Sequence, residues 1–215
     1  MSVAVPVRRK VLIDYLRESG IADERVLAAM AAVPREHFVP AALRHQAYED
    51  YPLEIGEGQT ISQPSVVARI TELAEVTPRD RVLEIGAGSG YQAAVLAELV
   101  KEVYTIEIVE PLARRAEADL KRLGCTNVHV RAGDGYQGWP EAAPFDAIMV
   151  TCAPEAVPQP LIAQLKDGGR MIIPVGPMGN QQLVLLRKEG ERLEKRAVLP
   201  VRFVPMTGAA GRGRD

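Results

Sequence analysis

The fold is decided by the stretch Val82-Leu83-Glu84-Ile85-Gly86-Ala87-Gly88-Ser89-Gly90-Tyr91. A short apolar, strand-like run leads directly into three glycines, and glycine lets the backbone turn sharply and approach a ligand without interference from a Cβ atom. The stretch lies where the first strand of an α/β unit is expected to turn into its helix, a context that suits a nucleotide-like cofactor. Taken alone, the stretch is equally consistent with a tight strand-to-helix connection that binds nothing.

The spacing of the glycines distinguishes two classes of cofactor. The dinucleotide fingerprint GxGxxG requires a glycine at position 91, but this chain has Tyr91 there and its glycines read GxGxG. A bulky side chain at that point opposes the close helix packing that helps to seat a pyrophosphate. The pattern therefore favours S-adenosylmethionine, which has no pyrophosphate, over a nicotinamide dinucleotide.

Two carboxylates follow the next two predicted strands. Glu107 ends the second strand, where it can accept hydrogen bonds from both hydroxyls of a ribose. Asp134 follows the third strand and can accept a hydrogen bond from the exocyclic amine of an adenine. Each also has an ordinary explanation, a solvated strand end for Glu107 and a turn aspartate for Asp134. Three such features at the ends of three successive strands together predict a cofactor site.

From residue 81 onward, strand-like and helix-like patterns alternate, which is typical of a parallel sheet with helices on both faces. After Gly176, two strand-like runs follow each other without room for a crossover helix, so we expect an antiparallel hairpin. The predicted fold is therefore α/β and Rossmann-like, with a mostly parallel, twisted, seven-stranded sheet. The predicted strands are Arg81–Ile85, Glu102–Ile106, Val128–Arg131, Phe145–Val150, Arg170–Pro174, Gln182–Lys188 and Leu193–Val204, and the helices between them are Gln92–Leu99, Pro111–Leu123 and Pro158–Leu165.

An N-terminal helical extension precedes the sheet in this prediction. Apolar residues at helical spacing predict short helices near residues 7–16 and 26–33, and Gln63-Pro64 begins a third helix that ends before Pro78. Residues 37–57 have no clear period and are predicted to be loop, and the segment from His37 to Gln59 is expected to form a lid over the substrate. We expect one domain over residues 1–215, made of the extension (1–78), a cofactor-binding core (79–177), C-terminal antiparallel strands (178–207) and a flexible tail (208–215).

Composition and charge argue against several other classes. The 215 residues carry 26 Lys and Arg against 28 Asp and Glu, so no basic excess is available for a nucleic-acid backbone. Cys125 and Cys152 lack CxxC spacing, which argues against a zinc site and a disulfide framework, and we expect no metal. No apolar run reaches the roughly 20 residues that span a bilayer, and the N-terminus lacks a signal-peptide core. We expect a soluble, cytoplasmic protein without a nucleic-acid or membrane partner.

Over roughly residues 8–207 the chain resembles bacterial protein-L-isoaspartate O-methyltransferases. The most specific similarity is the segment Gly56-Glu57-Gly58-Gln59-Thr60-Ile61-Ser62-Gln63-Pro64 ahead of the sheet. The glycine loop, Gly133-Asp134-Gly135 and the run Leu165-Lys166-Asp167-Gly168-Gly169-Arg170 also match. The resemblance implies a Rossmann-like methyltransferase fold and a protein repair enzyme that transfers a methyl group from S-adenosyl-L-methionine to the free α-carboxylate of L-isoaspartyl residues. We expect the enzyme to be a monomer. Cys152 is unusual, since relatives usually carry a small residue there.

The resemblance also implies roles for individual residues. Ser62 is expected to be the catalytic residue, and the segment just before it is expected to line the cleft shared by cofactor and substrate. The expected cofactor-binding residues are Gln59, Thr60, Ile61, Glu84, Gly86, Gly88, Gly90, Glu107, Asp134, Gly135 and Thr207.

The chemistry of the implied substrate agrees with the residues present. An α-carboxyl group has a pKa of about 3.3–3.7, so it is ionised at neutral pH and needs no general base. The chain has only three histidines, none of them in a convincing triad. Ser62 could donate a hydrogen bond to one carboxylate oxygen and direct the other oxygen toward the methyl group. Without the resemblance, a cap for the helix near Pro64 would be the simpler role for Ser62.

Three other functions remain open from the sequence. A methyltransferase of RNA or of a small molecule would share the glycine loop but not residues 59–64. A nicotinamide-dependent dehydrogenase is disfavoured by Tyr91. A binding module that has kept the fold and lost activity is opposed by the presence of Ser62, Glu107 and Asp134.

Overall fold

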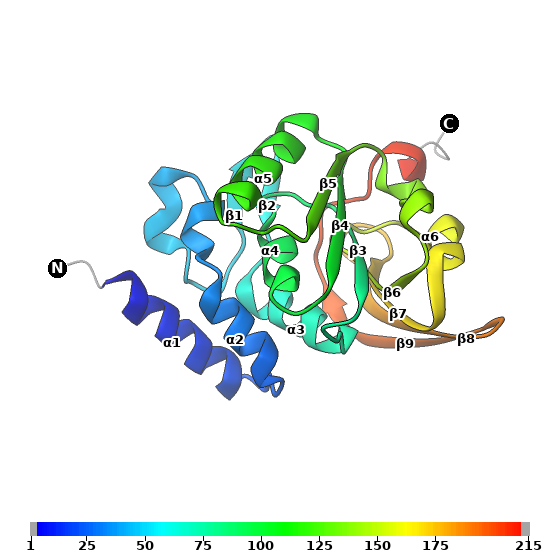
Figure 1. Ribbon diagram of the computed structural model, residues 1–215, viewed down its shortest axis with the longest axis horizontal. Helices are drawn as coiled ribbons and strands as arrows, with labels where there is room; N and C mark the ends of the chain where they lie inside the picture. The colour runs from blue at the N-terminus through cyan, green and yellow to red at the C-terminus, as the bar shows by residue number, and fades with distance from the viewer. Residues whose placement is uncertain (1–3, 212–215) are drawn as a thin grey trace.

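The computed structural model describes residues 4–211 and is built around a seven-stranded sheet (Figure 1). The strand order is β5-β4-β3-β6-β7-β8-β9; β3 to β7 run parallel, and β8 and β9 pair antiparallel. The strands are β3 (Arg81–Ile85), β4 (Glu102–Glu107), β5 (Val128–Ala132), β6 (Phe145–Val150), β7 (Leu165–Val175), β8 (Gln181–Glu189) and β9 (Arg192–Val201). The predicted mostly parallel sheet and its C-terminal hairpin are confirmed.

Side chains on the strands alternate between two hydrophobic cores. On β3, Val82 packs into one core, whereas Leu83 and Ile85 pack into the other. Successive strand residues point to opposite faces, so a strand such as β3, in which Val82 to Ile85 are all buried, must be covered on both sides. Residues of α1 to α5 share the first core, and α6 belongs to the second. The helices are α1 (Val5–Glu18), α2 (Glu24–Ala32), α3 (Pro64–Ala74), α4 (Tyr91–Ala97), α5 (Glu110–Arg122) and α6 (Gln159–Gln164).

Most helices begin at local signals that the sequence supplies. The carboxylate of Asp23 accepts a hydrogen bond from the N–H of Arg25 at 2.9 Å and caps α2. Helix α3 begins with Pro64, as predicted, but its N-cap residue Gln63 makes no side-chain capping bond. Instead, a carboxylate oxygen of Asp50 accepts a hydrogen bond from the N–H of Ser65 at 2.8 Å. A residue from the preceding segment therefore caps α3.

The carboxyl end of β3 lies at the switch point of the sheet. The chain moves outward from β3 through β4 to β5 and then returns to β6, on the other side of β3. Ligands of open α/β sheets bind in the crevice beside such a point, because the connections on its two sides run in opposite directions. The glycine loop at residues 86–90 follows β3 directly, so the topology places it at this crevice.

Residues 37–57, predicted to be loop, contain short ordered elements. Two 3-10 helices, η1 (Arg35–Phe38) and η2 (Ala41–Gln46), precede a hairpin of β1 (Leu53–Gly56) and β2 (Gln59–Ile61). The hairpin turns at Glu57 and Gly58, both with positive φ, as in a two-residue type I′ turn. The loop prediction was wrong here because an apolar alternation of only two buried residues in β1 is too short to be recognised in a sequence.

The chain after β9 returns to the sheet. Pro205 pairs with Ala153 in an isolated bridge, so β9 ends earlier than the predicted boundary at Val204. Residues 208–211, predicted to belong to a flexible tail, form the 3-10 helix η5 (Gly208–Gly211), where the N–H of Ala209 donates to Asp134 at 2.7 Å. The rest of the predicted tail, residues 212–215, lies outside the described residues.

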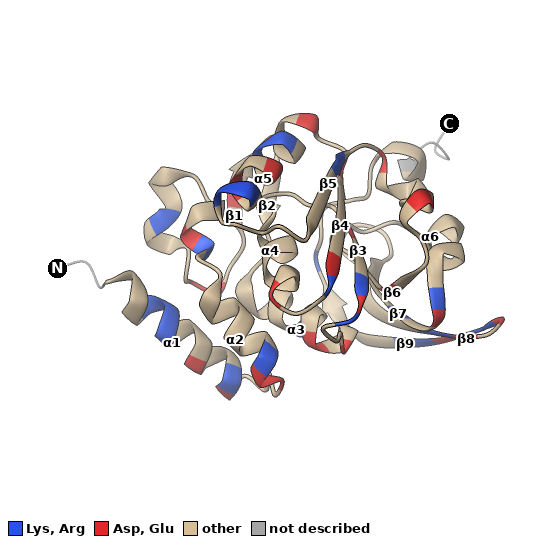
Figure 2. Cartoon of the chain, in the orientation of Figure 1, with Lys and Arg blue, Asp and Glu red and all other residues tan. Residues whose placement is uncertain are grey.

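Charges of both signs are mixed on the surface. Figure 2 shows Lys and Arg beside Asp and Glu along α1, α5 and the β8–β9 hairpin. Several of them form ion pairs, including Arg17 with Glu24 and Arg187 with Glu75. Among residues 4–211, no helix combines the length and the apolar character needed to cross a membrane.

Candidate cofactor and substrate site

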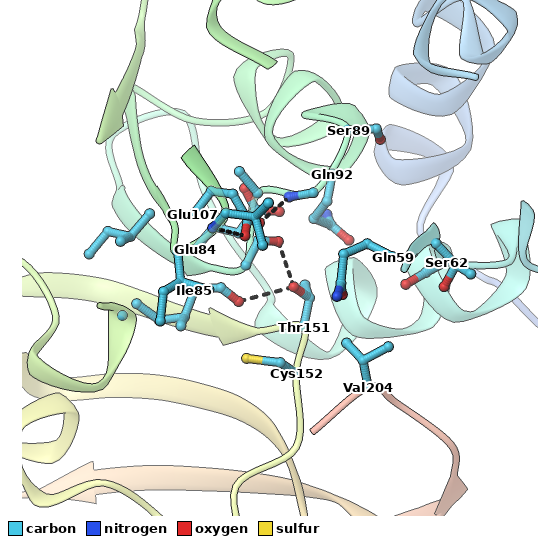
Figure 3. Close-up of a pocket in the computed structure, with 18 of the residues that line it drawn as sticks. Gln59, Ser62, Glu84, Ile85, Ser89, Gln92, Glu107, Thr151, Cys152 and Val204 are labelled. Carbon is cyan, nitrogen blue, oxygen red and sulfur yellow. Dashed lines mark hydrogen bonds between the residues drawn. The ribbon is translucent and has the colours of Figure 1, made fainter. Parts of the chain in front are cut away.

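A pocket lies beside the switch point of the sheet, and the space within its walls, counted together with the open solvent at its mouth, is about 910 Å³. Its walls come from residues 59–62, from the carboxyl ends of β3, β4 and β6, and from residues 204–207. Figure 3 shows Gln59 and Ser62 on one side of the pocket, facing Glu84 and Glu107 on the other. Elements far apart in the sequence thus meet around one cavity.

The glycine loop is held in shape from the neighbouring strand. The hydroxyl of Thr151, directly after β6, donates to the carbonyl oxygens of Gly86 at 2.6 Å and of Ile85 at 3.0 Å. Gly86 has φ +96°, and a Cβ atom there would lie 2.4 Å from Oγ1 of Thr151. Only glycine fits this position, because both the backbone angle and the contact exclude a side chain.

Glu107 is fixed at the end of β4 with only 6% of its surface exposed. Its Oε2 accepts a hydrogen bond from the N–H of Gly88 at 2.7 Å, and its Oε1 accepts one from the N–H of Val109 at 2.9 Å. Each carboxylate oxygen can accept a further hydrogen bond. The side chain lines the pocket, so it presents an oriented acceptor pair to a ligand.

Two buried acceptors in the pocket wall lack donors. The hydroxyl of Thr105 donates to Oε2 of Glu84 at 2.5 Å, and the amide of Gln92 donates to Oγ1 of Thr71 at 2.9 Å. Oε1 of Glu84 and Oε1 of Gln92 find no hydrogen-bond partner among the described residues. Burial raises the pKa of Glu84 from 4.5 to about 8; the Thr105 hydrogen bond opposes this shift and the charge of Glu107 adds to it. Buried acceptors are normally satisfied, so these two atoms indicate a ligand that carries donors.

The charge of the pocket wall is one-sided. Among the described residues that line it, Glu84 and Glu107 supply carboxyl groups and no Lys, Arg or His is present. Phosphates are usually bound by Arg, Lys or helix N-termini, and carboxylates repel them. The wall therefore suits a ligand with cationic groups and hydroxyls rather than a dinucleotide. Within residues 4–211, no group of three or more His, Cys, Asp or Glu could hold a metal ion.

Ser62 faces this pocket from the gap between β2 and α3. It lies one residue before the N-cap of α3, and the N–H of Ser65 in the first turn is already bound by Asp50. The simpler role of Ser62 as a helix cap is therefore not observed. Its carbonyl oxygen accepts a hydrogen bond from Nη2 of Arg35 at 2.8 Å.

Most of the predicted site residues meet in this pocket. Those that line it are Gln59, Thr60, Ile61, Ser62, Glu84, Gly86, Gly88, Glu107, Gly135 and Thr207. Gly90 and Asp134 do not. Gly90, with φ +87°, is the N-cap of α4, and a Cβ atom there would lie 3.2 Å from that of Ala116. Asp134 accepts backbone hydrogen bonds from Tyr136 at 2.9 Å and Ala209 at 2.7 Å, and so ties η5 to the sheet.

Several lining residues were not predicted from the sequence. They are Val67, Ala87, Ser89, Tyr91, Gln92, Ile108, Val109, Thr151, Cys152, Val204, Pro205 and Met206, together with Ile85 and Ile106. Thr151 and Cys152 could have been found from their place at the carboxyl end of a strand. Burial raises the pKa of Cys152 to about 12, so its thiol is protonated and unreactive at neutral pH.

Comparisons with known proteins agree on one family. The family model for protein-L-isoaspartate(D-aspartate) O-methyltransferase matches residues 7–211. A protein-L-isoaspartate O-methyltransferase of Opitutus terrae is 57% identical over 93% of this chain and 86% of its own, and that of Gloeobacter violaceus is 58% identical over 90% and 95%. A solved protein-L-isoaspartate O-methyltransferase has a TM-score of 0.85 at 34% identity, covering 95% of this chain and 67% of its own.

One solved relative contains a ligand. A Plasmodium falciparum structure, described as a protein-L-isoaspartate O-methyltransferase, is a complex with S-adenosyl-L-homocysteine. It has a TM-score of 0.81 at 27% identity and covers 93% of this chain and 98% of its own. The similarity therefore extends over the pocket as well as the sheet.

Proposed function

Because the chain belongs to the protein-L-isoaspartate(D-aspartate) O-methyltransferase family, we propose that the pocket between Glu107 and Ser62 is its active site. The enzyme transfers a methyl group from S-adenosyl-L-methionine to the free α-carboxylate of L-isoaspartyl residues in damaged proteins and peptides. The products are a methyl ester and S-adenosyl-L-homocysteine.

The observation that carries this assignment is the fixed carboxylate of Glu107. Its two oxygens are held by the N–H groups of Gly88 and Val109, 2.7 and 2.9 Å away, so the carboxylate cannot turn away from the pocket. A carboxylate fixed in this way can accept from both hydroxyls of a ribose. Glu107 is therefore proposed to select the nucleoside part of the cofactor.

The unsatisfied acceptors provide the second half of the cofactor site. Oε1 of Glu84 and Oε1 of Gln92 are buried in the wall without donors. The α-ammonium of a methionine moiety carries three N–H donors and a positive charge. We assign these acceptors to that group, which satisfies them and offsets the negative charge of the wall.

Ser62 is proposed to orient the substrate. In an in-line displacement, a carboxylate oxygen forms a bond to the methyl carbon while the carbon–sulfur bond breaks and sulfur keeps the electron pair. An ionised carboxylate needs no deprotonation, so the task of the protein is alignment and exclusion of water, worth on the order of 7–11 kcal/mol. The hydroxyl of Ser62 can donate to one carboxylate oxygen and leave the other free to attack.

Transfer of labelled methyl to paired peptides tests the substrate. The two peptides differ only in whether one residue is aspartyl or isoaspartyl. We expect label in the isoaspartyl peptide, and we expect mild base to release it, because a methyl ester hydrolyses there and methylated nitrogen does not. Label on the aspartyl peptide, or base-stable label, would contradict the assignment.

The Ser62→Ala variant tests the proposed catalytic residue. We expect kcat to fall by about 10- to 100-fold, because the substrate carboxylate loses its orienting donor, while the dissociation constant of S-adenosyl-L-homocysteine changes by less than about twofold. Ser65→Ala is the matched control, since its side chain faces Gln63 rather than the pocket. A wild-type kcat in Ser62→Ala would remove Ser62 from the mechanism.

A further inference from the structure

Tyr91, which interrupts the dinucleotide fingerprint, packs against the N-terminal extension. It is the first residue of α4, directly after the glycine loop, and is 2% exposed. Phe38 of η1 contacts its ring edge-on, with the two ring centroids 5.6 Å apart. The guanidinium carbon of Arg35, also in η1, lies 4.7 Å from the centroid of the Tyr91 ring. The side chain after the cofactor loop is thus covered by residues from a different part of the chain.

Arg35 is completely buried and forms no direct salt bridge within residues 4–211, although the charge of Asp50 acts on it from further away. Its Nε donates to the carbonyl of Ala47 at 2.9 Å and its Nη2 donates to the carbonyl of Ser62 at 2.8 Å, while Nη1 has no partner. Removing a charge from water costs free energy, and buried charges in proteins are usually paired. An apolar residue would fill this space at lower cost, so packing alone does not account for an arginine here.

The bond to Ser62 supports a short stretch of irregular backbone. Strand β2 ends at Ile61 and α3 begins at Pro64, so Ser62 and Gln63 belong to neither element. The carbonyl of Ser62 takes part in no backbone hydrogen bond with either neighbour. Arg35 supplies the partner that regular secondary structure would otherwise provide.

We propose that Arg35 is a positioning residue that fixes the backbone of Ser62 against the glycine loop through its contact with Tyr91. The proposal rests on the role of Ser62 given above. A guanidinium is planar and its donors point in fixed directions, so two carbonyls and one aromatic ring define its place. Through it, Ser62 is held at a set distance from Tyr91 and therefore from the cofactor loop. A misplacement of about 1 Å can cost on the order of 100-fold in rate.

Two variants of Arg35 test this, each made alone and in combination with Ser62→Ala. Arg35→Met removes every donor and keeps much of the side-chain length, whereas Arg35→Lys can hold only one carbonyl. The measured quantities are kcat, the peptide KM and the dissociation constant of S-adenosyl-L-homocysteine. Folded sites are counted from the stoichiometry of S-adenosyl-L-homocysteine binding, so that loss of folded protein does not register as loss of turnover.

We expect Arg35→Met to lower kcat by about 10- to 100-fold while the dissociation constant of S-adenosyl-L-homocysteine changes by less than about threefold. The kcat of Arg35→Lys should lie between those of Arg35→Met and the wild type. In the Ser62→Ala background, Arg35→Met should lower kcat by less than about twofold further, because a residue that acts through Ser62 has nothing left to position. If Arg35→Met binds no S-adenosyl-L-homocysteine, the fall in kcat is compared between the two backgrounds with Arg35→Lys instead.

Arg9→Met is the matched control. Arg9 is also partly buried, donates to the carbonyl of Ala31 at 3.0 Å and lies 5.7 Å from the ring centroid of Tyr48, but it does not contact Ser62. We expect it to lower stability and leave kcat per folded site unchanged. A wild-type kcat in Arg35→Lys would overturn the proposal. So would an Arg35→Met substitution that lowers kcat by the same factor in the wild-type and the Ser62→Ala backgrounds. An unchanged kcat in Ser62→Ala alone would instead refute the role of Ser62, and the positioning role with it.

Discussion

Replacing Glu84 with glutamine should change how stability depends on pH. Glu84 is entirely buried in β3, and burial raises the pKa of its carboxyl from 4.5 to about 8. Between these two values, the folded protein holds a proton that the unfolded chain has released. The free energy of unfolding of the wild type therefore falls as pH rises through this interval, and the contribution is fully present only below the lower value. Glutamine has nearly the same shape and does not titrate.

The size of the effect follows from the same two pKa values. The interval from 4.5 to about 8 corresponds to roughly 3 to 5 kcal/mol for a single carboxyl. Because Glu84 is completely buried, solvent screening does not reduce this figure substantially. Relative to Glu84→Gln, the wild type should lose about 3 kcal/mol of unfolding free energy between pH 5 and pH 8. Above pH 8 the unfolding free energies of the two proteins should change in parallel with pH.

Urea unfolding of both proteins without cofactor, at one-unit steps from pH 5 to pH 9, measures this difference. The exposed Glu54 gives the control variant Glu54→Gln, whose profile should follow that of the wild type within about 0.5 kcal/mol. Wild-type and Glu84→Gln profiles that run parallel from pH 5 to pH 8 would show that Glu84 is already ionised in the folded protein, which refutes the reasoning.

Two further predictions concern the loop and its anchor. Gly90→Ala should lower the free energy of unfolding by about 1–3 kcal/mol in urea titration, since alanine disfavours φ +87° and its Cβ would press against Ala116; an unchanged midpoint would contradict this. Glu107→Gln should weaken S-adenosyl-L-homocysteine binding at least about tenfold in calorimetry, because an amide offers one acceptor oxygen in place of two, and wild-type affinity would remove Glu107 from the cofactor site.

The sheet could be predicted because its signals are local. Short apolar runs separated by helical patterns mark a parallel sheet, and the boundaries of β3 and β6 were predicted to the residue. The hairpin of β1 and β2 could not be found, because it depends on tertiary contacts. One of these is the hydrogen bond from Arg115 of α5 to the carbonyl of Ile55, at 2.5 Å. No pattern within residues 53–61 encodes that contact.

Part of the site could also be predicted from local signals in the sequence. Residues at or just after the carboxyl ends of strands, such as Glu107 and Gly86, were found because the sheet itself brings them together. Thr151 follows β6 by the same rule and was overlooked, since a threonine at a strand end carries no distinctive pattern. Val204 reaches the pocket only because residue 205 bridges to residue 153, a pairing between segments far apart in sequence.

Asp134 shows where the chemistry of a residue does not determine its contacts. A carboxylate after the third strand was expected beside an adenine, yet its two oxygens accept backbone hydrogen bonds from Tyr136 and Ala209. A carboxylate oxygen has room for a second donor, so these bonds leave some capacity for a ligand. The contact with η5 could not be predicted, because the sequence after residue 207 contains only small and polar residues.

The charge of the pocket wall bears on the reaction itself. The substrate is an anion, but the described lining residues include no cation that could attract it. Glu84 is largely protonated at neutral pH in the free protein, which leaves Glu107 as the principal negative charge of the wall. Its carboxylate is partly neutralised by two backbone N–H donors. In the proposed complex the α-ammonium of the cofactor is bound by Glu84 and Gln92, so the positive sulfur is the cation left to attract the incoming carboxylate. A wall without competing cations therefore directs the substrate oxygen toward the one centre at which it reacts.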